Sequence, residues 1–236
     1  MADRKAFFDA LRRDLFPAGL KQEQVDRIGA LFDAIDNAGW PQAWAAYALA
    51  TAHHETAKWQ YMKELGGADY FKRMYDKDGS RPQVAKALGN TVAGDGVKFA
   101  GRGFVQLTGR ANYSKAGKAI GLDLLKEPDL AADPDIAARI LIWGMQTGAY
   151  TGKKNADYLD QSPPDYAGAR RIINGTDRAA LVAGYAKQFA DALSAAGYGA
   201  PAPSNPDQEA KAEPVQPVSD GFWSRFLAAI KKRLAA

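Results

Sequence analysis

Apolar side chains recur at helical spacing in three consecutive segments before residue 56, and this periodicity constrains the fold more than any other feature. Pro17 and Gly19 separate the first segment from the second, and Asn37–Gly39 ends the second before Pro41 opens the third. We expect one helix in each segment. The apolar positions are Phe7, Phe8, Leu11, Leu15 and Phe16, then Val25, Ile28, Leu31, Phe32 and Ile35, then Trp44, Tyr47 and Ala48.

The following residues also favour helices over strands. Helical patterns return over residues 113–120, 134–150 and 177–196, whereas the glycine-rich stretch 66–112 predicts mostly loop with short turns. Only residues 104–108, FVQLT, have the pattern of a strand, and a brief one. The predicted fold class is therefore mainly α.

The composition changes after residue 199. Residues 200–219 hold five of the twelve prolines and almost no large apolar residue, so they cannot bury enough surface to fold. They predict a semi-extended linker. We expect a folded domain over residues 1–199, a Pro/Ala-rich linker over 200–220 and a cationic amphipathic helix over 221–236.

The net charge of +4 excludes one class of function, because the charge is unevenly placed. The last sixteen residues carry four basic side chains and no acid, so residues 1–220 sum to zero and do not predict a nucleic-acid-binding domain. The absence of cysteine excludes disulfides and thiolate chemistry. The N-terminus lacks the apolar core of a secretory signal, and no stretch approaches the ~18 apolar residues of a membrane span.

The segment 221–236, GFWSRFLAAIKKRLAA, places large apolar side chains on one face of a helix and basic ones mainly opposite. We expect it to bind an anionic membrane or lipopolysaccharide, and the alternative is a helix that docks on the chain's own domain. The residues proposed for membrane contact are Phe222, Trp223, Phe226, Leu227, Ile230, Arg225, Lys231, Lys232 and Arg233.

Both histidines of the chain, His53 and His54, stand directly before Glu55, which leaves three interpretations: a metal site, a glycosidase acid or a polar helix end. A zinc-protease motif needs a second histidine four residues after the first, but Lys58 holds that position after His54. The stretch DKDGS at 76–80 lacks the further acids of a calcium loop and predicts a turn. We expect no metal and no cofactor.

Two glutamates nine residues apart suggest acid–base chemistry. Glu55 continues the helix face of Tyr47 and Thr51, which we expect to be partly buried, so desolvation would favour its protonated form. Glu64 precedes Gly66 and should lie at a loop edge in a wetter environment. Two carboxyls in unlike surroundings suit glycoside hydrolysis, although such a pair alone is unspecific.

Glycines alternate with polar side chains over residues 94–113, GDGVKFAGRGFVQLTGRANY. The lysine and hydroxyl of a phosphate-binding loop are missing. One interpretation is a crossover with a buried strand. The other is a tight backbone that presents Gln106, Thr108 and Asn112 to a groove, where neutral donors and acceptors would bind sugars.

Four motifs follow one another along the chain: HHET followed by KELGG, then GRGFVQLTGRANY, then PDLAADPDIAARILIW, and finally RRIINGTD. In this order they give the chain a marked resemblance to glycoside hydrolase family 19, above all to its bacteriophage endolysins and less closely to plant-type chitinases. It covers roughly residues 5–197. The chitinases usually carry Asn-Gly-Gly where this chain has Asn174-Gly175-Thr176.

The resemblance implies a lysozyme-like, two-lobed helical domain that hydrolyses peptidoglycan with inversion. It implies that Glu55 is the general acid, that Glu64 is the base and that Thr108 helps to hold the attacking water. It also implies a monomer that stays in the host cytoplasm until a holin opens the membrane. The side chains implied to line the substrate groove are Gln106, Asn112, Tyr113 and Asn174.

Four alternatives differ in chemistry. A chitinase would use the same acids on chitin oligomers. A lytic transglycosylase would need one acid and leave 1,6-anhydro ends, a wall-binding module would tolerate loss of Glu55, and a membrane-disrupting protein would act through residues 221–236 alone.

Overall fold

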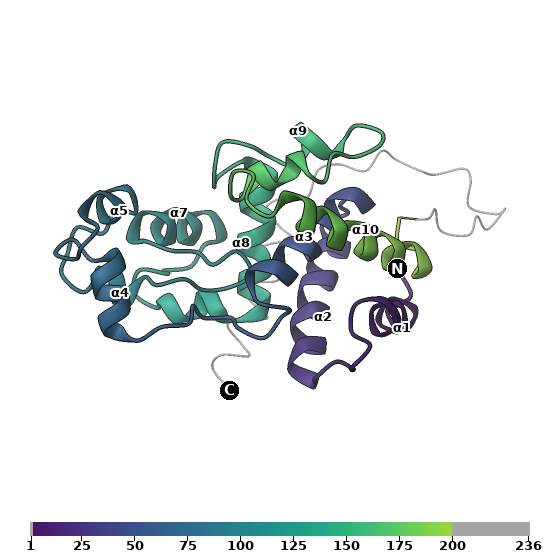
Figure 1. Ribbon diagram of the computed structural model, residues 1–236, viewed down its shortest axis with the longest axis horizontal. Helices are drawn as coiled ribbons and strands as arrows, with labels where there is room; N and C mark the ends of the chain where they lie inside the picture. Colours follow the sequence, from purple (N-terminus) through teal and green to yellow (C-terminus); the bar gives the residue numbers. More distant parts are fainter. Residues whose placement is uncertain (1, 200–236) are drawn as a thin grey trace. The chain divides into compact units, whose positions relative to one another are not determined.

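The computed structural model describes residues 2–199, so the expectations for the linker and for the amphipathic segment 221–236 lie outside the described residues. The predicted class is confirmed: the described chain is mainly helical and contains no strand, only two isolated β-bridges (Figure 1). None of its helices is long and apolar enough to cross a membrane. The helices are α1 (Arg4–Asp14), α2 (Gln22–Asn37), α3 (Gln42–Glu55), α4 (Ala68–Tyr75), α5 (Pro82–Ala87), α6 (Asp95–Lys98), α7 (Arg110–Ile120), η1 (Pro128–Ala132), α8 (Pro134–Thr147), α9 (Ala156–Leu159), η2 (Gly168–Ile172) and α10 (Ala179–Ala195).

The three N-terminal helices form where the apolar periodicity predicts them. In α1, Asp3 caps the first turn by accepting the Ala6 N–H, and Phe7, Phe8 and Leu11 are buried. In α2 the buried stripe runs from Ile28 to Ile35. In α3 every residue from Ala45 to His53 is buried, because α2, α8 and α10 all pack against it. This helix is therefore the centre of the larger core.

Helix α8 separates two hydrophobic cores and contributes to both. Asp133 caps its N-terminus, Pro134 occupies the first turn, and Gly148 ends it in the left-handed conformation. Ile136 and Ile140 belong to the smaller core. The opposite face belongs to the larger core with α1, α2, α3 and α10; its buried α8 side chains are Ala137, Ala138, Leu141, Ile142 and Met145.

Residues 66–120, named here the small lobe, contain more helix than the glycine-rich sequence predicts. Helices α4, α5 and α6 lie within the stretch expected to be mostly loop, and α4, α5 and α7 gather at one end of the molecule, away from α1 and α10 (Figure 1). Helices α4 and α5 have only eight and six residues, so each contains too few apolar positions to show a helical period in the sequence. At the other boundaries, α7 begins three residues earlier than predicted and α8 ends three residues earlier.

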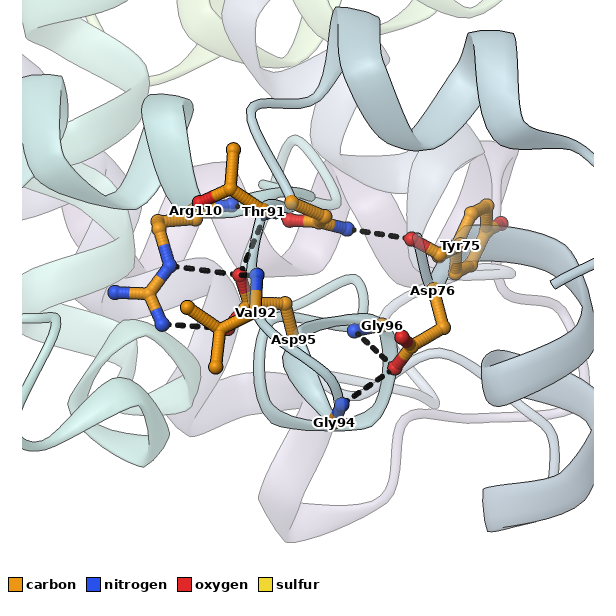
Figure 2. Close-up of polar contacts among 9 residues, drawn as sticks. Tyr75, Asp76, Thr91, Val92, Gly94, Asp95, Gly96 and Arg110 are labelled. Atoms are coloured by element: carbon orange, nitrogen blue, oxygen red, sulfur yellow. Dashed lines mark hydrogen bonds and ion pairs between the residues drawn. The ribbon is translucent and has the colours of Figure 1, made fainter. Parts of the chain in front are cut away.

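Two buried carboxylates hold the small lobe together (Figure 2). Asp76 accepts the N–H groups of Gly94 and Gly96, and Asp95 accepts two backbone N–H groups and pairs with Arg110 at 2.8 and 2.5 Å. These bonds stabilise the ionised form of Asp95, so its pKa lies below the usual range although burial opposes this. Loop 91–96 is therefore fixed against the end of α4.

The brief strand predicted over residues 104–108 is wrong. Residues 103–106 form a turn that closes a β-bridge between Arg102 and Leu107, and Gln106 within it has a φ of 49°. A second bridge joins Arg102 to Lys63. Phe104 and Leu107 of FVQLT are buried and Val105 is partly buried, but Gly103 at φ 77° turns the chain back before any ladder can form.

Candidate active site

Glu55 is the last residue of α3, where the buried helix reaches the surface. Tyr47 and Thr51, two turns and one turn earlier on the same face, have no exposed surface, whereas the Glu55 side chain keeps 19% of its exposure. Burial along this face is thus greater than predicted. Glu55 itself stands at the edge between core and solvent.

Arg170, in η2, binds Glu55 and changes the environment expected for it. Its Nη1 donates to Glu55 Oε1 at 2.6 Å, and its Nε donates to the carbonyl of Asp177 at 3.0 Å. Only 2% of the Arg170 side chain is exposed. This buried guanidinium is a partner of Glu55 that the apolar helix face did not predict. With Oε1 occupied, Oε2 is the oxygen free to carry a proton.

The two histidines support this helix end. His53 is buried, and its Nδ1 accepts the Trp59 Nε1–H at 3.2 Å, so Nε2 carries the ring hydrogen. Burial lowers the pKa of His53 to about 4, which keeps the ring neutral at neutral pH. Burial also lowers the pKa of His54, although Glu55 beside it opposes that change. A neutral imidazole packed among aromatic rings, as His53 is, serves the structure of the site.

Two donors hold the Glu64 carboxylate. Tyr75, at the end of α4, donates its hydroxyl to Oε1 at 2.7 Å, and the Gly101 N–H donates to Oε2 at 2.9 Å. Burial and the hydrogen bond to Glu64 raise the pKa of Tyr75, which keeps its proton in place. The Glu64 N–H in turn donates to the Gly101 carbonyl at 2.8 Å. Glu64 is thus half-buried and fixed by side chain and backbone.

Gly101 allows Gln106 and Glu64 to approach one another. A Cβ atom on Gly101 would lie 2.9 Å from both Gln106 Oε1 and Glu64 Oε2, closer than real Cβ contacts. The Gln106 side chain is oriented by its Nε2, which donates to the Gly103 carbonyl at 3.1 Å. The amide oxygen and the carboxylate therefore flank the same glycine, and any larger residue there would displace one of them.

Thr108 and Asn112 follow this turn. The Thr108 hydroxyl donates to the carbonyl of Gln106 at 2.8 Å, and Asn112 Nδ2 donates to the Thr108 carbonyl at 2.8 Å. Both residues are partly buried. The Thr108 hydroxyl oxygen retains lone pairs with which it can accept a hydrogen bond from a water.

We expect Thr108→Val to lower hydrolysis at least about tenfold if the hydroxyl positions the attacking water, a loss at the small end of what catalytic positioning contributes. Valine keeps the β-branched shape, so packing is preserved. Initial rates and thermal melting should be measured together. A stably folded variant with near-normal rates would show that Thr108 serves only the turn, through its bond to Gln106.

Tyr113 is buried, which corrects the expectation that it lines the substrate groove, and the hollow that it borders is lined by neither Glu55 nor Glu64. It has no exposed surface, and its hydroxyl donates to the Ala100 carbonyl at 2.8 Å and accepts from Arg102 at 2.9 Å. Burial raises the pKa of Tyr113 to about 12, so the hydroxyl remains protonated. Tyr113 acts on the site indirectly, by fixing the segment that carries Gly101.

Asn174 is exposed on the loop after η2, and its N–H donates to the Arg170 carbonyl at 2.9 Å. Arg170 therefore connects Glu55 to this loop at two points, Asn174 and Asp177. Glu64, for its part, borders an open hollow of about 530 Å³ that Arg27, Tyr61 and Leu65 also line. Within residues 2–199 no hydrogen bond or ion pair joins Glu55 to Glu64, so the structure presents two groups connected by residues 56–63.

Sequence reasoning missed Arg170, Tyr75 and Gly101. Arg170 belongs to the quoted motif RRIINGTD, but nothing local distinguishes it from Arg171, which is exposed. Tyr75 carries no signal, because its role depends on where α4 ends. A buried arginine 115 residues from its partner can be found only from the fold.

This arrangement offers one carboxyl group that can donate a proton and one carboxylate that can accept a proton. Glu55 has one free oxygen at a helix end, and Glu64 is an anchored carboxylate next to a hydroxyl and an amide. A proton donor and a proton acceptor in different surroundings are the two groups that glycoside hydrolysis with inversion uses.

Comparison with known proteins agrees with this geometry. The family profile of glycoside hydrolase family 19, described as class I chitinase, matches residues 28–168. Chitinase 3 of Oryza sativa subsp. japonica is 28% identical over 170 residues, covering 63% of this chain and 53% of that protein. An endochitinase of Persea americana is 28% identical over 170 residues, covering 63% and 52%. The chain spans about half the length of these curated relatives.

Solved structures extend the likeness to the fold. The crystal structure of a bacterial family 19 chitinase has a TM-score of 0.56 and 25% identity, and the match covers 81% of this chain and 94% of that one. Chitinase C from Streptomyces griseus HUT6037 has a TM-score of 0.52 and 25% identity, covering 83% and 92%. These matches place the described domain among the lysozyme-like glycoside hydrolases. Because the profile covers more than half of the sequence, the chain belongs to glycoside hydrolase family 19.

Proposed function

We propose that this protein is an endolysin that hydrolyses β-1,4 glycosidic bonds of bacterial peptidoglycan. Glu55 protonates the leaving oxygen through Oε2, and Glu64, with Thr108, activates a water on the opposite face of the sugar. Inversion requires the carboxyls to be ~6.5–9.5 Å apart, so that the water fits between them. In this proposal the protein is a monomer that stays in the host cytoplasm until a holin releases it.

The charge of the small lobe supports a wall glycan over chitin. Residues 66–120 hold ten Lys and Arg against four Asp, a net charge of +6, whereas the rest of the described chain has 16 basic and 19 acidic residues, a net charge of −3. Eight of the ten basic side chains are exposed, and two of the four acids, Asp76 and Asp95, are buried. A cationic surface attracts the free carboxylates of peptidoglycan stem peptides, and chitin offers none.

Chitinase remains the second candidate, because the matched plant and bacterial proteins are named chitinases. Mass spectrometry of glycans digested by the full chain separates the candidates. Reducing N-acetylmuramic acid ends support the proposal. Anhydro ends would indicate a lytic transglycosylase, and cleavage of chitin oligomers with intact peptidoglycan would indicate a chitinase.

The charge argument has its own test. Lys72, Lys86 and Lys118 are exposed on the small lobe, and Lys21, Lys153 and Lys187 are exposed elsewhere. Changing the first three to glutamine should lower kcat/KM on soluble peptidoglycan fragments several-fold at low ionic strength, with a smaller loss at high salt. The second set, with the same change in net charge, should have little effect. Equal losses for both sets would make the effect one of net charge only.

The segment 221–236 completes the proposal as a membrane or lipopolysaccharide anchor, in which each basic residue contributes ~1 kcal/mol near an anionic surface. Truncation after Ser219 should leave hydrolysis of purified peptidoglycan intact and reduce both vesicle binding and the killing of intact cells. Sedimentation with anionic and neutral vesicles measures the first effect, and colony counts measure the second. Equal killing by the truncated protein, or its unfolding, would contradict a membrane role.

A further inference from the structure

Helix α3 ends in a turn with an unusual backbone. Ala57, Lys58 and Trp59 have φ values of 49°, 62° and 67°, so three consecutive residues with side chains adopt the left-handed conformation. This conformation is unfavourable for residues with a side chain and normally occurs singly. Such strain persists only where the surroundings impose it. The surroundings of residues 57–59, named here the left-handed turn, therefore have to supply several compensating contacts.

Helix α2 supplies contacts from one side. Gln24 Nε2 donates to the Lys58 carbonyl at 2.7 Å, and Arg27 Nη1 donates to the carbonyls of Trp59 at 2.7 Å and Gln60 at 2.9 Å. These two side chains, three residues apart on one helix face, bind three successive carbonyls. Hydrogen bonds to a charged donor contribute more than neutral ones, so Arg27 is the principal contact.

The core supplies contacts from the other side. Trp59 has no exposed surface, and its ring packs edge-on against Phe104 and Phe189. Its Nε1–H donates to His53 Nδ1, and its backbone N–H donates to the Thr56 hydroxyl at 3.0 Å. The Lys58 N–H donates to the His53 carbonyl at 2.7 Å. The turn is therefore bound on both sides, while the side chains of Ala57 and Lys58 point to solvent.

The position of this turn gives the strain a consequence. It lies between Glu55 and Glu64, and only residues 60–63 separate it from the base. Those residues end at the β-bridge of Lys63 with Arg102, and the Gly103 N–H donates to the Met62 carbonyl at 2.8 Å. Residues 60–63 are thus fixed at both ends. The backbone of the left-handed turn therefore determines the direction in which the chain runs from α3 to Glu64.

We propose that the left-handed turn, held by Arg27 of α2, sets the position of Glu64 relative to Glu55, which makes Arg27 a positioning residue for the two acids. The proposal rests on the proposed glycoside hydrolysis for its kinetic readout only. It predicts that loss of Arg27 lets the turn relax to an ordinary conformation and moves the acids apart or out of line. A displacement of about 1 Å can cost about 10²-fold in rate.

The experiment uses Arg27→Gln in the full chain, with Glu23→Gln as the matched control. Glu23 is the ion-pair partner of Arg27 at 3.1 Å and is 77% exposed. Arg27→Gln should lower kcat at least about tenfold with KM changed less than about twofold, and Glu23→Gln should change neither. A rise in KM at constant kcat would overturn the proposal and make Arg27 a substrate contact, since it also borders the hollow beside Glu64.

A second change separates positioning from general stability. Glycine adopts positive φ without the penalty of a side chain, so Ala57→Gly with Lys58→Gly should restore the turn in the Arg27→Gln background. We expect kcat to recover to within about threefold of wild type, because two strained residues are relieved. A lack of recovery would overturn the proposal, since the role of Arg27 would then be independent of the strain.

Amide hydrogen exchange provides a readout without activity. The Lys58 N–H should exchange at least about tenfold faster in Arg27→Gln than in Glu23→Gln, because the turn opens more often. If the wild type cleaves neither peptidoglycan nor chitin, the proposed function fails, while exchange at Lys58 still tests the contact. Unchanged exchange, or faster exchange with unchanged kcat on whichever glycan is cleaved, would overturn the positioning role.

Discussion

Glu55→Gln and Glu64→Gln should each lower the rate of glycan hydrolysis by at least ~10²-fold, the usual contribution of one positioned acid or base. Both groups act in the same transition state, so neither loss can be offset by the other. The substitutions are nearly isosteric. Steady-state rates on the cleaved glycan, with circular dichroism as a check of folding, measure the effect.

The surroundings of each acid indicate that the variants will fold. A glutamine at position 64 can accept the Gly101 N–H with its oxygen and turn its amide group toward Tyr75, whose hydroxyl is able to accept. A glutamine at position 55 can still accept from Arg170. Loss of activity in a folded protein therefore reports chemistry. Substantial activity in Glu64→Gln with none in Glu55→Gln would replace the inverting mechanism with a single-acid one.

The parts of the fold that the sequence predicts are those with long apolar periodicity. Helices α2, α3, α8 and α10 are 14 to 17 residues long, so their spacing of buried side chains is legible without a structure. Glu55 follows from the same pattern, because a helix face that is buried as far as Thr51 must bring the next turn to the edge of the core. Its position was predictable from residues alone.

The small lobe was less predictable because its order depends on bonds between distant residues. Helix α6 has four residues, too few to carry a periodic signal, and its loop is fixed by Asp76 and Arg110, each well separated in sequence from residues 91–96 (Figure 2). Likewise, FVQLT has the composition of a strand but turns at Gln106. Tertiary contacts overrode local propensity there.

Contacts between residues distant in sequence also explain why the environment of Glu55 was only partly predicted. Glu55 was expected to be sheltered, which is correct, but the guanidinium that binds it comes from 115 residues away. The family resemblance implied that Tyr113 lines the groove, yet its hydroxyl binds the Ala100 carbonyl and Arg102 in the core. Residue type and order thus identified the candidate region, and only the packing showed which of its side chains are exposed and which are buried.

Arg170 should be the residue outside the acid pair whose loss has the largest effect. Arg170→Gln leaves the Glu55 carboxylate without its ion partner and also removes the bond from Arg170 Nε to the Asp177 carbonyl. Breaking a buried pair costs 3–5 kcal/mol in general, and we expect about 3 kcal/mol here, because Glu55 keeps partial contact with water. The free energy of unfolding in urea measures this cost.

The activity of Arg170→Gln should fall at least about tenfold, since Glu55 loses the contact that aims its free oxygen. Arg170→Lys should recover little of the activity, because an ammonium cannot bind Glu55 and the Asp177 carbonyl with the geometry of a planar guanidinium. Initial rates on the cleaved glycan compare the two variants. Full activity in Arg170→Gln would mean that Glu55 is oriented by α3 alone.

A double-mutant cycle tests whether the stability cost arises from the pair. In the Glu55→Gln background the ion pair is already broken and the Arg170 guanidinium is the charge left without a partner, so Arg170→Gln should destabilise the domain by at least about 1 kcal/mol less than it does in the wild type. The coupling should persist at high salt, because a pair with one partner 2% exposed is weakly screened. Equal costs in both backgrounds would show that Arg170 stabilises the domain through the Asp177 carbonyl and its own packing, and that Glu55 is independent of it.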